Sequence, residues 1–312
     1  MPTTINSTVK GKAYEYACVL ALQEIVSPIR TIVIIESSSM AMVRQRYGEV
    51  TSQERRQMLL SAKAGINKII EMEPKILEDG GDTLTVSIQS DRVAQETGDV
   101  RDVLIIRNSI HWEIGVSVKH NHAALKHSRL SMTIDFGEKW LGVSCSDNYF
   151  EEIRPMFDRL ERLKAQGKLW SELPNTHEET YMPILNAFKR EIESIVRENR
   201  NASKALIRYL FGSNGKDYYK LIHRNNNVVR IMPFNFCGML NGNTFPESEY
   251  PTRIIELDYK ENSMTTLVLT MDKGWSFSLR IHSAKTAVEP SLKFDINLIS
   301  IPASLFYLDV EW

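Results

Sequence analysis

The sequence predicts a mixed α/β fold in which a mixed sheet is flanked by helices and is followed by a helical, then β-rich, C-terminal half. Apolar residues recur at helical spacing in two segments near the N-terminus, whereas three segments between residues 83 and 120 read as strands. A chain of 312 residues can bury a substantial core in one large domain or two ordinary ones. The composition shifts after Asp147, which suggests a core over residues 1–150 and a second region over residues 151–312.

The N-terminal segments have clear helix signals. One helix is expected over Lys12–Val26, before Pro28. A second is expected to begin at the capping box Thr51-x-x-Glu54 and to stop before Pro74.

Strands are expected next, over Thr83–Gln89, Val100–Arg107 and His111–His120, with a tight turn at Asn108-Ser109 between the last two. A short helix over Asn121–Met132 and a fourth strand over Trp140–Cys145 are expected to follow.

Helices are expected in the C-terminal half over Tyr149–Ala165, Tyr181–Asn199 and Ala202–Phe211, the last closed by Gly212. The remainder reads as β. Its expected strands are DYYKLIHR, NVVRIM, RIIELDY, TTLVLTM, WSFSLRI and FDINLI.

The hydrophobic fraction of 43% and the charged fraction of 25% are ordinary for a globular protein. The formal net charge is -1, so a nucleic-acid partner would require basic residues concentrated locally. Cys18, Cys145 and Cys237 form no Cys-x-x-Cys pair, which favours reduced thiols in a cytoplasmic protein over a zinc ribbon or a disulfide framework. The apolar run Ile29–Ile35 is too short to span a bilayer, and the N-terminus lacks the apolar run of a signal peptide.

Asp102 near the start of one strand and Lys119 at the end of the next could lie a few ångströms apart. Phosphodiester hydrolysis needs a metal ion to neutralise the phosphate and a cation to orient the water or stabilise developing charge. Mg²⁺ prefers one or two carboxylates. The pair therefore predicts a Mg²⁺-dependent nuclease centre, with solvated turn residues as the alternative interpretation.

Basic residues gather in two places. No acid occurs from Ile114 to Ile134. If the stretch after Asn121 is helical, Asn121 is its N-cap and His122, Lys126 and Arg129 share one face, with His127 nearby. Near the C-terminus, donors suited to phosphates and base edges are Arg280, His282, Lys285 and Lys293.

Several runs resemble the HaeIII-type restriction endonucleases. They span most of the chain and are GKAYEYACVLAL, GDVRDVLIIR, EIGVSVKHNHAALKHSRLS, IDFGEKW and WSFSLRIHSAKTAVEPSLKFDI. The resemblance implies a restriction-endonuclease-like core of the PD-(D/E)xK superfamily. It also implies Mg²⁺-dependent cleavage of double-stranded DNA at a short palindrome, GGCC for HaeIII-type enzymes.

One position departs from the superfamily pattern, which has an acid two residues before the lysine, where this chain has Ser117. Glu113 shares that strand face, but about six residues of strand, roughly 20 Å, separate it from Lys119. The resemblance makes Glu15 on the first helix the preferred second carboxylate, because related nucleases place an acid there. Weaker candidates are Asp99, Asp135 and Glu138.

In this reading Asp102 and Glu15 bind the metal ion, Lys119 orients the water or stabilises charge, and Ser117 contacts a metal-bound water. A repair nuclease of the same fold without sequence specificity and a DNA-binding protein without catalysis remain the alternatives. A palindromic site favours a two-fold dimer, although some such enzymes act as monomers.

Overall fold

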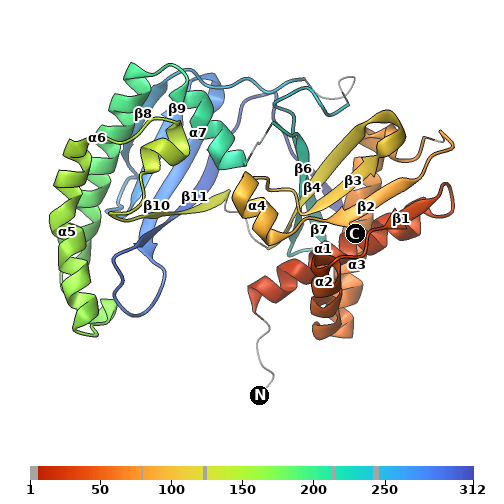
Figure 1. The fold of residues 1–312 in the computed structure, drawn as a ribbon, viewed down its shortest axis with the longest axis horizontal. Coiled ribbons are helices and arrows are strands. Elements are labelled where there is room, and N and C mark those ends of the chain that lie inside the picture. Colours follow the sequence, from red (N-terminus) through yellow and green to blue (C-terminus); the bar gives the residue numbers. More distant parts are fainter. Residues whose placement is uncertain (1–5, 79, 122–124, 213–214, 242–245) are drawn as a thin grey trace. The chain divides into compact units, whose positions relative to one another are not determined.

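A computed structural model describes residues 6–78, 80–121, 125–212, 215–241 and 246–312 (Figure 1). The chain divides into two compact units. The first contains residues 1–123, 212–248 and 304–312, and the second contains residues 124–211 and 249–303. None of the described helices is long and apolar enough to cross a membrane.

The first unit is built on a mixed seven-stranded sheet of order β1-β2-β3-β4-β6-β7-β12. Two neighbouring pairs, β1–β2 and β4–β6, are parallel, and the other pairs are antiparallel. The strands are β1 (Ile32–Ile34), β2 (Leu84–Ile88), β3 (Val103–Arg107), β4 (Trp112–His120), β6 (Tyr218–Arg224), β7 (Val228–Phe234) and β12 (Leu308–Glu311).

The α-helices among the described residues of this unit are α1 (Ser7–Val26), α2 (Ser38–Glu49), α3 (Ser52–Met72) and α4 (Asp91–Thr97). The expected first helix and the Thr51–Glu54 capping box are confirmed. Apolar residues of α1 and α3 form one core with those of β2, β3, β4, β6 and β7. The expectations did not include α2, of which only Met40 and Val43 are buried, or α4.

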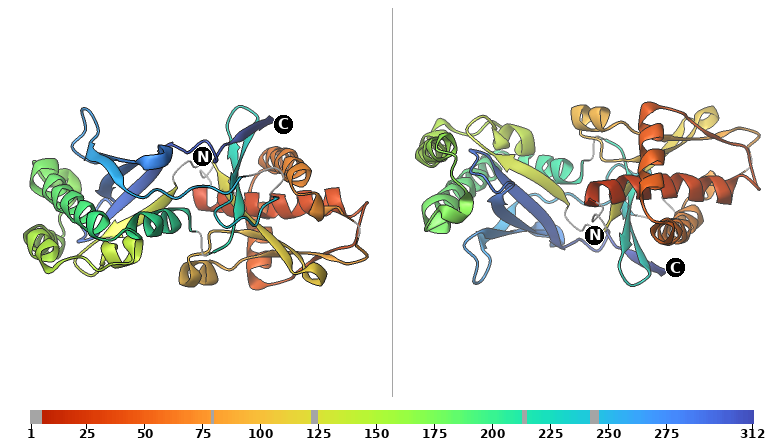
Figure 2. Two further views of the ribbon diagram at one scale, coloured as in Figure 1. Left: turned by 90° about the horizontal axis from the view of Figure 1, so that it is seen from above. Right: turned by 90° about the horizontal axis from the view of Figure 1, so that it is seen from below.

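The second unit contains an antiparallel five-stranded sheet of order β5-β11-β10-β9-β8. Within this unit α5 and α6 lie side by side on one side of the sheet (Figure 2). The expected helices and late strands are confirmed. The elements are β5 (Lys126–Leu130), α5 (Asp147–Ala165), α6 (Met182–Glu198), α7 (Ala202–Phe211), β8 (Ile254–Tyr259), β9 (Thr266–Met271), β10 (Ser276–Ser283) and β11 (Leu292–Ser300).

Two predicted elements are wrong. The segment expected to be a helix over Asn121–Met132 contains strand β5, whose side chains alternate between buried and more exposed positions and which pairs with β11. Asn121 is no helix N-cap, since it has a φ of 52° and its N–H donates to the His223 carbonyl at 2.8 Å. The expected strand over Trp140–Cys145 instead begins in a π-helical turn, Gly137–Leu141, whose Trp140 ring packs against Phe188.

The division into units does not coincide with the expected boundary near residue 150. The parallel partners β4 and β6 cannot be joined by a hairpin and need a long crossover. Here that crossover carries β5, α5, α6 and α7, which lie in the second unit. The chain therefore leaves the first unit and returns to it.

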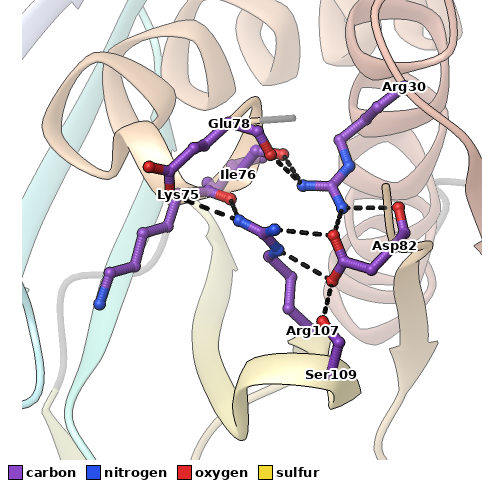
Figure 3. A network of polar contacts seen from close by, with 7 residues as sticks. All are labelled: Arg30, Lys75, Ile76, Glu78, Asp82, Arg107 and Ser109. Carbon is purple, nitrogen blue, oxygen red and sulfur yellow. Dashed lines mark hydrogen bonds and ion pairs between the residues drawn. The ribbon is translucent and has the colours of Figure 1, made fainter. Parts of the chain in front are cut away.

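A polar network around two buried arginines, Arg30 and Arg107, supports the end of β3 (Figure 3). The Asp82 carboxylate accepts hydrogen bonds from Arg107 at 2.7 and 3.1 Å, from Arg30 at 2.5 Å and from Ser109 at 2.5 Å. Arg30 also donates to the carbonyls of Ile76 and Glu78, and Arg107 donates to that of Lys75. The network ties the chain after α1 to the far end of the strand that Asp102 precedes.

Candidate active site

Asp102 and Lys119 meet at one end of the β3–β4 hairpin. Asp102 lies directly before β3, and Lys119 is the penultimate residue of β4. The antiparallel register pairs Val103 with Val116 and brings the Lys119 Nζ to 3.0 Å from the Asp102 Oδ2. The expected proximity of the two side chains is therefore present.

Ser117 lies beside this pair. Its Oγ is 3.4 Å from the Asp102 Oδ2, which also accepts a hydrogen bond from the Val118 N–H at 2.7 Å. Every hydrogen bond that the described residues donate to the Asp102 carboxylate reaches Oδ2. The Asp102 Oδ1 is left available for a ligand from outside the protein.

Glu15 extends from α1 into the same region and is only 5% exposed. Burial and the nearby charge of Asp102 raise the pKa of Glu15 to about 8, against the opposing effects of Lys12 and Lys119. The Lys12 Nζ lies 3.1 Å from the Glu15 Oε1 and 2.7 Å from the Asp91 Oδ1. The carboxylate expected from outside the hairpin is thus close enough to Asp102 for the two charges to repel.

The other candidate acids have different partners. Asp99 and Glu113 both bind Arg101, with contacts of 2.7 and 2.6 Å. Arg101 crosses the sheet at Gly115, where a Cβ would lie 2.3 Å from the Arg101 Cδ. This close approach requires glycine on β4.

Asp135 and Glu138 lie in the second unit. Asp135 accepts hydrogen bonds from the backbone N–H groups of Glu138 and Cys145, which gives it a local structural role. Its pKa is lowered because these hydrogen bonds outweigh the effect of burial.

The donor set suits a hard divalent cation that keeps several waters. Mg²⁺ commonly binds proteins through one or two carboxylates, and Glu15 and Asp102 supply two whose mutual repulsion a cation would offset. No group of three or more His, Cys, Asp or Glu side chains suited to a metal ion occurs among the described residues. The chemistry of this pair fits Mg²⁺ better than a transition metal.

Two lysines at the site were missed. Lys12 lies one helical turn before Glu15, a spacing that could have indicated an ion pair. The carboxylates of Glu15, Asp91 and Asp102 raise its pKa although burial opposes them. Lys220 lies in strand β6, which is buried except at its last residue. Lysine is rarely buried unless it is paired, so its place between tyrosine and leucine in this predicted strand could also have indicated a role.

Predicted DNA-binding residues from two distant segments meet on one face of the five-stranded sheet. We call this surface the polar face. Five of the predicted residues project from it: His127, Arg129, Arg280, His282 and Lys293. Lys293 pairs with Arg129 on one side and with His282 on the other, and Asp295 pairs with His127 and Arg280.

Asp295 is the acid at the centre of the polar face. Its carboxylate lies 2.5 Å from His127, 2.9 Å from His282 and 3.6 Å from Lys293. Burial opposes ionisation, but the contacts with His127, His282 and Lys293 keep the pKa of Asp295 below its usual value. One acid thus organises several basic groups on this surface.

The remaining predicted contacts lie elsewhere. Lys126 is on the opposite side of β5, where its ammonium donates to the Tyr209 carbonyl at 2.7 Å and lies 3.9 Å from that ring's centroid. Burial lowers the pKa of Lys126 to about 8. Lys285 is exposed and pairs with Glu289 at 3.2 Å, as Arg129 does. His122 lies outside the described residues, and Asn121 ends the described segment after β4.

The mixed sheet with helices on it, and a carboxylate and a lysine converging at a hairpin end, define a restriction-endonuclease-like α/β core. The comparisons with known proteins name the family more closely.

The family model of the HaeIII restriction endonuclease matches residues 11–302. The type II restriction enzyme HaeIII of Haemophilus aegyptius is 43% identical over 317 residues, which covers 98% of this chain and 98% of that protein. The chain therefore belongs to the HaeIII restriction endonuclease family, whose substrate is DNA and whose class generally uses a divalent metal ion. No solved structure matches the chain.

Proposed function

We propose that this protein is a type II restriction endonuclease that cuts both strands of DNA at GGCC in the presence of Mg²⁺. The observation that carries the proposal is the convergence in the first unit of Glu15 from α1, Asp102 from the residue before β3 and Lys119 from β4. The similarity to a type II restriction enzyme over 98% of both chains supports the sequence-specific form of the activity.

Each residue of the candidate site has a separate role in the proposed reaction. Asp102 and Glu15 would hold Mg²⁺, which supplies a Lewis acid for the phosphate and an activated water. Lys119 carries a positive charge beside Asp102, where it can orient the attacking water or stabilise the charge that develops on the phosphate. Ser117 offers a hydroxyl to a water in the place where the superfamily pattern has an acid.

The two units take different roles in this proposal. The first unit contains the cutting centre, and the second reads the sequence or clasps the duplex through its polar face. That face offers guanidinium, imidazole and ammonium donors, the groups that bind phosphates and the acceptor edge of guanine.

The direct test is digestion of DNA of known sequence with Mg²⁺, followed by mapping of the ends. We expect discrete fragments whose ends map to GGCC sites and no cutting in EDTA. A smear would instead indicate a nuclease of the same fold without fixed sequence. Intact DNA with correctly folded protein and Mg²⁺ would refute the nuclease function.

Asp102→Ala separates catalysis from binding. We expect the variant to lose cutting and to retain DNA binding, because it removes a metal ligand and a negative charge near phosphate. Asp158→Ala is the matched control, since Asp158 is exposed on α5. A variant that neither cuts nor binds, or one that still cuts, would contradict the assigned role.

A further inference from the structure

Lys220 shares a sheet face with the cutting centre. It lies on β6, whose parallel register places it opposite Ser117 on β4. On β4, Val118 lies between Ser117 and Lys119 and points into the core, and on β6 Leu221, next to Lys220, does the same. Because side chains alternate along a strand, Ser117, Lys119 and Lys220 project from the opposite face of the sheet. Lys119 and Lys220 are therefore diagonal neighbours on adjacent strands.

Lys12 and Lys119 each form an ion pair with an acidic side chain, whereas Lys220 forms none among the described residues. Lys12 pairs with Glu15 and Asp91, and Lys119 pairs with Asp102. Lys220 is only 5% exposed, yet it forms no ion pair within the part of the chain that the structure describes. A buried charge is costly unless it is paired, so this position calls for an anion from outside the protein.

The surroundings indicate which anion would bind. Burial and the neighbouring charge of Lys119 lower the pKa of Lys220 to about 8, whereas Asp102 opposes that shift. An anion that binds beside Asp102 and Lys119 is the phosphodiester that the proposed function places there. Its non-bridging oxygens are acceptors suited to an ammonium group.

We propose that Lys220 is a catalytic residue that binds a non-bridging oxygen of a DNA phosphate at the cutting centre. The proposal rests on the proposed function, because that function brings the phosphate to this sheet face. It assigns a second lysine to the site, supplied by β6 rather than by the β3–β4 hairpin.

The salt dependence of DNA binding tests this contact. A lost phosphate contact reduces the slope of log K against log salt by about 0.9. We expect this reduction for Lys220→Met, measured in EDTA so that DNA stays intact, together with a fall in single-turnover cutting of about 100-fold or more with Mg²⁺. Lys220→Arg should retain the wild-type slope because it keeps the charge.

Lys68→Met is the control, because Lys68 is a lysine on α3 that pairs with Glu71. An unchanged slope for Lys220→Met, equal to that of Lys68→Met, overturns the proposal even if cutting falls, since a purely structural or positioning role would leave the slope unaltered. If Lys220→Met fails to fold, Lys220→Gln replaces it in the same measurement.

Failure of the proposed function gives a different result. In that case wild-type protein leaves DNA intact with Mg²⁺. The binding slopes in EDTA do not depend on cutting, so they still decide whether Lys220 contacts a phosphate.

Discussion

At the scale of single residues, the site derives its chemistry from charges that the fold places close together. Glu15 would be an ordinary exposed acid on an isolated helix, but here burial and Asp102 raise its pKa. Lys119 would be a solvated strand residue, but here it pairs with Asp102 at 3.0 Å. Each side chain has its role because of its neighbours.

Glu15→Gln tests the second metal ligand. The change keeps the shape of the side chain and removes its charge, so we expect single-turnover cutting to fall by at least about 100-fold, the upper range for residues that merely support a ligand. DNA binding should be retained. Glu24→Gln, on the same helix and paired with Lys63, is the matched control. Full activity in Glu15→Gln would refute Glu15 as the second acid.

At the scale of elements, strand β3 connects the candidate site at one of its ends to the polar network around Asp82 at the other. Asp102 precedes its first residue, and Arg107 is its last. The network around Asp82 holds Arg107, while the register with β4 sets the position of Asp102 relative to Lys119. The strand is thus held at the end away from the proposed chemistry.

Asp82→Asn should destabilise the protein in a pH-dependent way. Hydrogen bonds from Arg107, Ser109 and Arg30 hold the pKa of Asp82 well below its ordinary value of 3.8. The folded protein therefore binds this proton less readily than the unfolded chain does, so the stabilisation is fully present above pH 3.8 and is lost as the pH falls through the folded-state pKa.

We expect the difference in melting temperature between wild type and Asp82→Asn to be largest near neutral pH and to shrink below about pH 4. Glu49→Gln, which affects an exposed pair with Arg46, should change the melting temperature little. A difference that stays constant down to pH 2 would show that the Asp82 charge does not contribute.

At the scale of the whole molecule, a nearly neutral chain concentrates its basic groups on particular surfaces. The formal net charge is -1, yet the polar face gathers Arg129, Arg280 and Lys293 from two distant segments. Such local segregation lets a protein without a global basic field bind DNA phosphates.

Arg280→Ala tests the polar face. Arg280 is exposed on β10, and loss of one phosphate contact should weaken DNA binding and reduce the salt slope by about 0.9. Loss of a contact to a guanine edge should instead relax sequence preference at one base pair. Arg154→Ala on α5 is the control, and a variant with unchanged affinity, slope and specificity would remove Arg280 from the DNA-binding surface.

The sequence alone predicted much of the secondary structure because most elements have clear local signals. The capping box at Thr51 and the alternation in β2 are examples. The helix expected after Asn121 was wrong because β5 has four consecutive polar residues and so lacks the apolar alternation of a strand, and its pairing with β11 makes it one. The seven-residue helix α4 and the three-residue strand β1 were too short to give a periodic signal.

The pairing of Asp102 with Lys119 was determined by the sequence, because the two residues lie on strands joined by a short turn and a hairpin brings them together. The positions of Glu15, Lys12 and Lys220 relative to that pair were decided only by the tertiary structure. These three come from α1 and β6, which meet the hairpin through helix packing and a parallel crossover of nearly 100 residues that local propensities do not specify. The hairpin thus follows from the local sequence, whereas the charged side chains around it are brought there only by the folding of the whole unit.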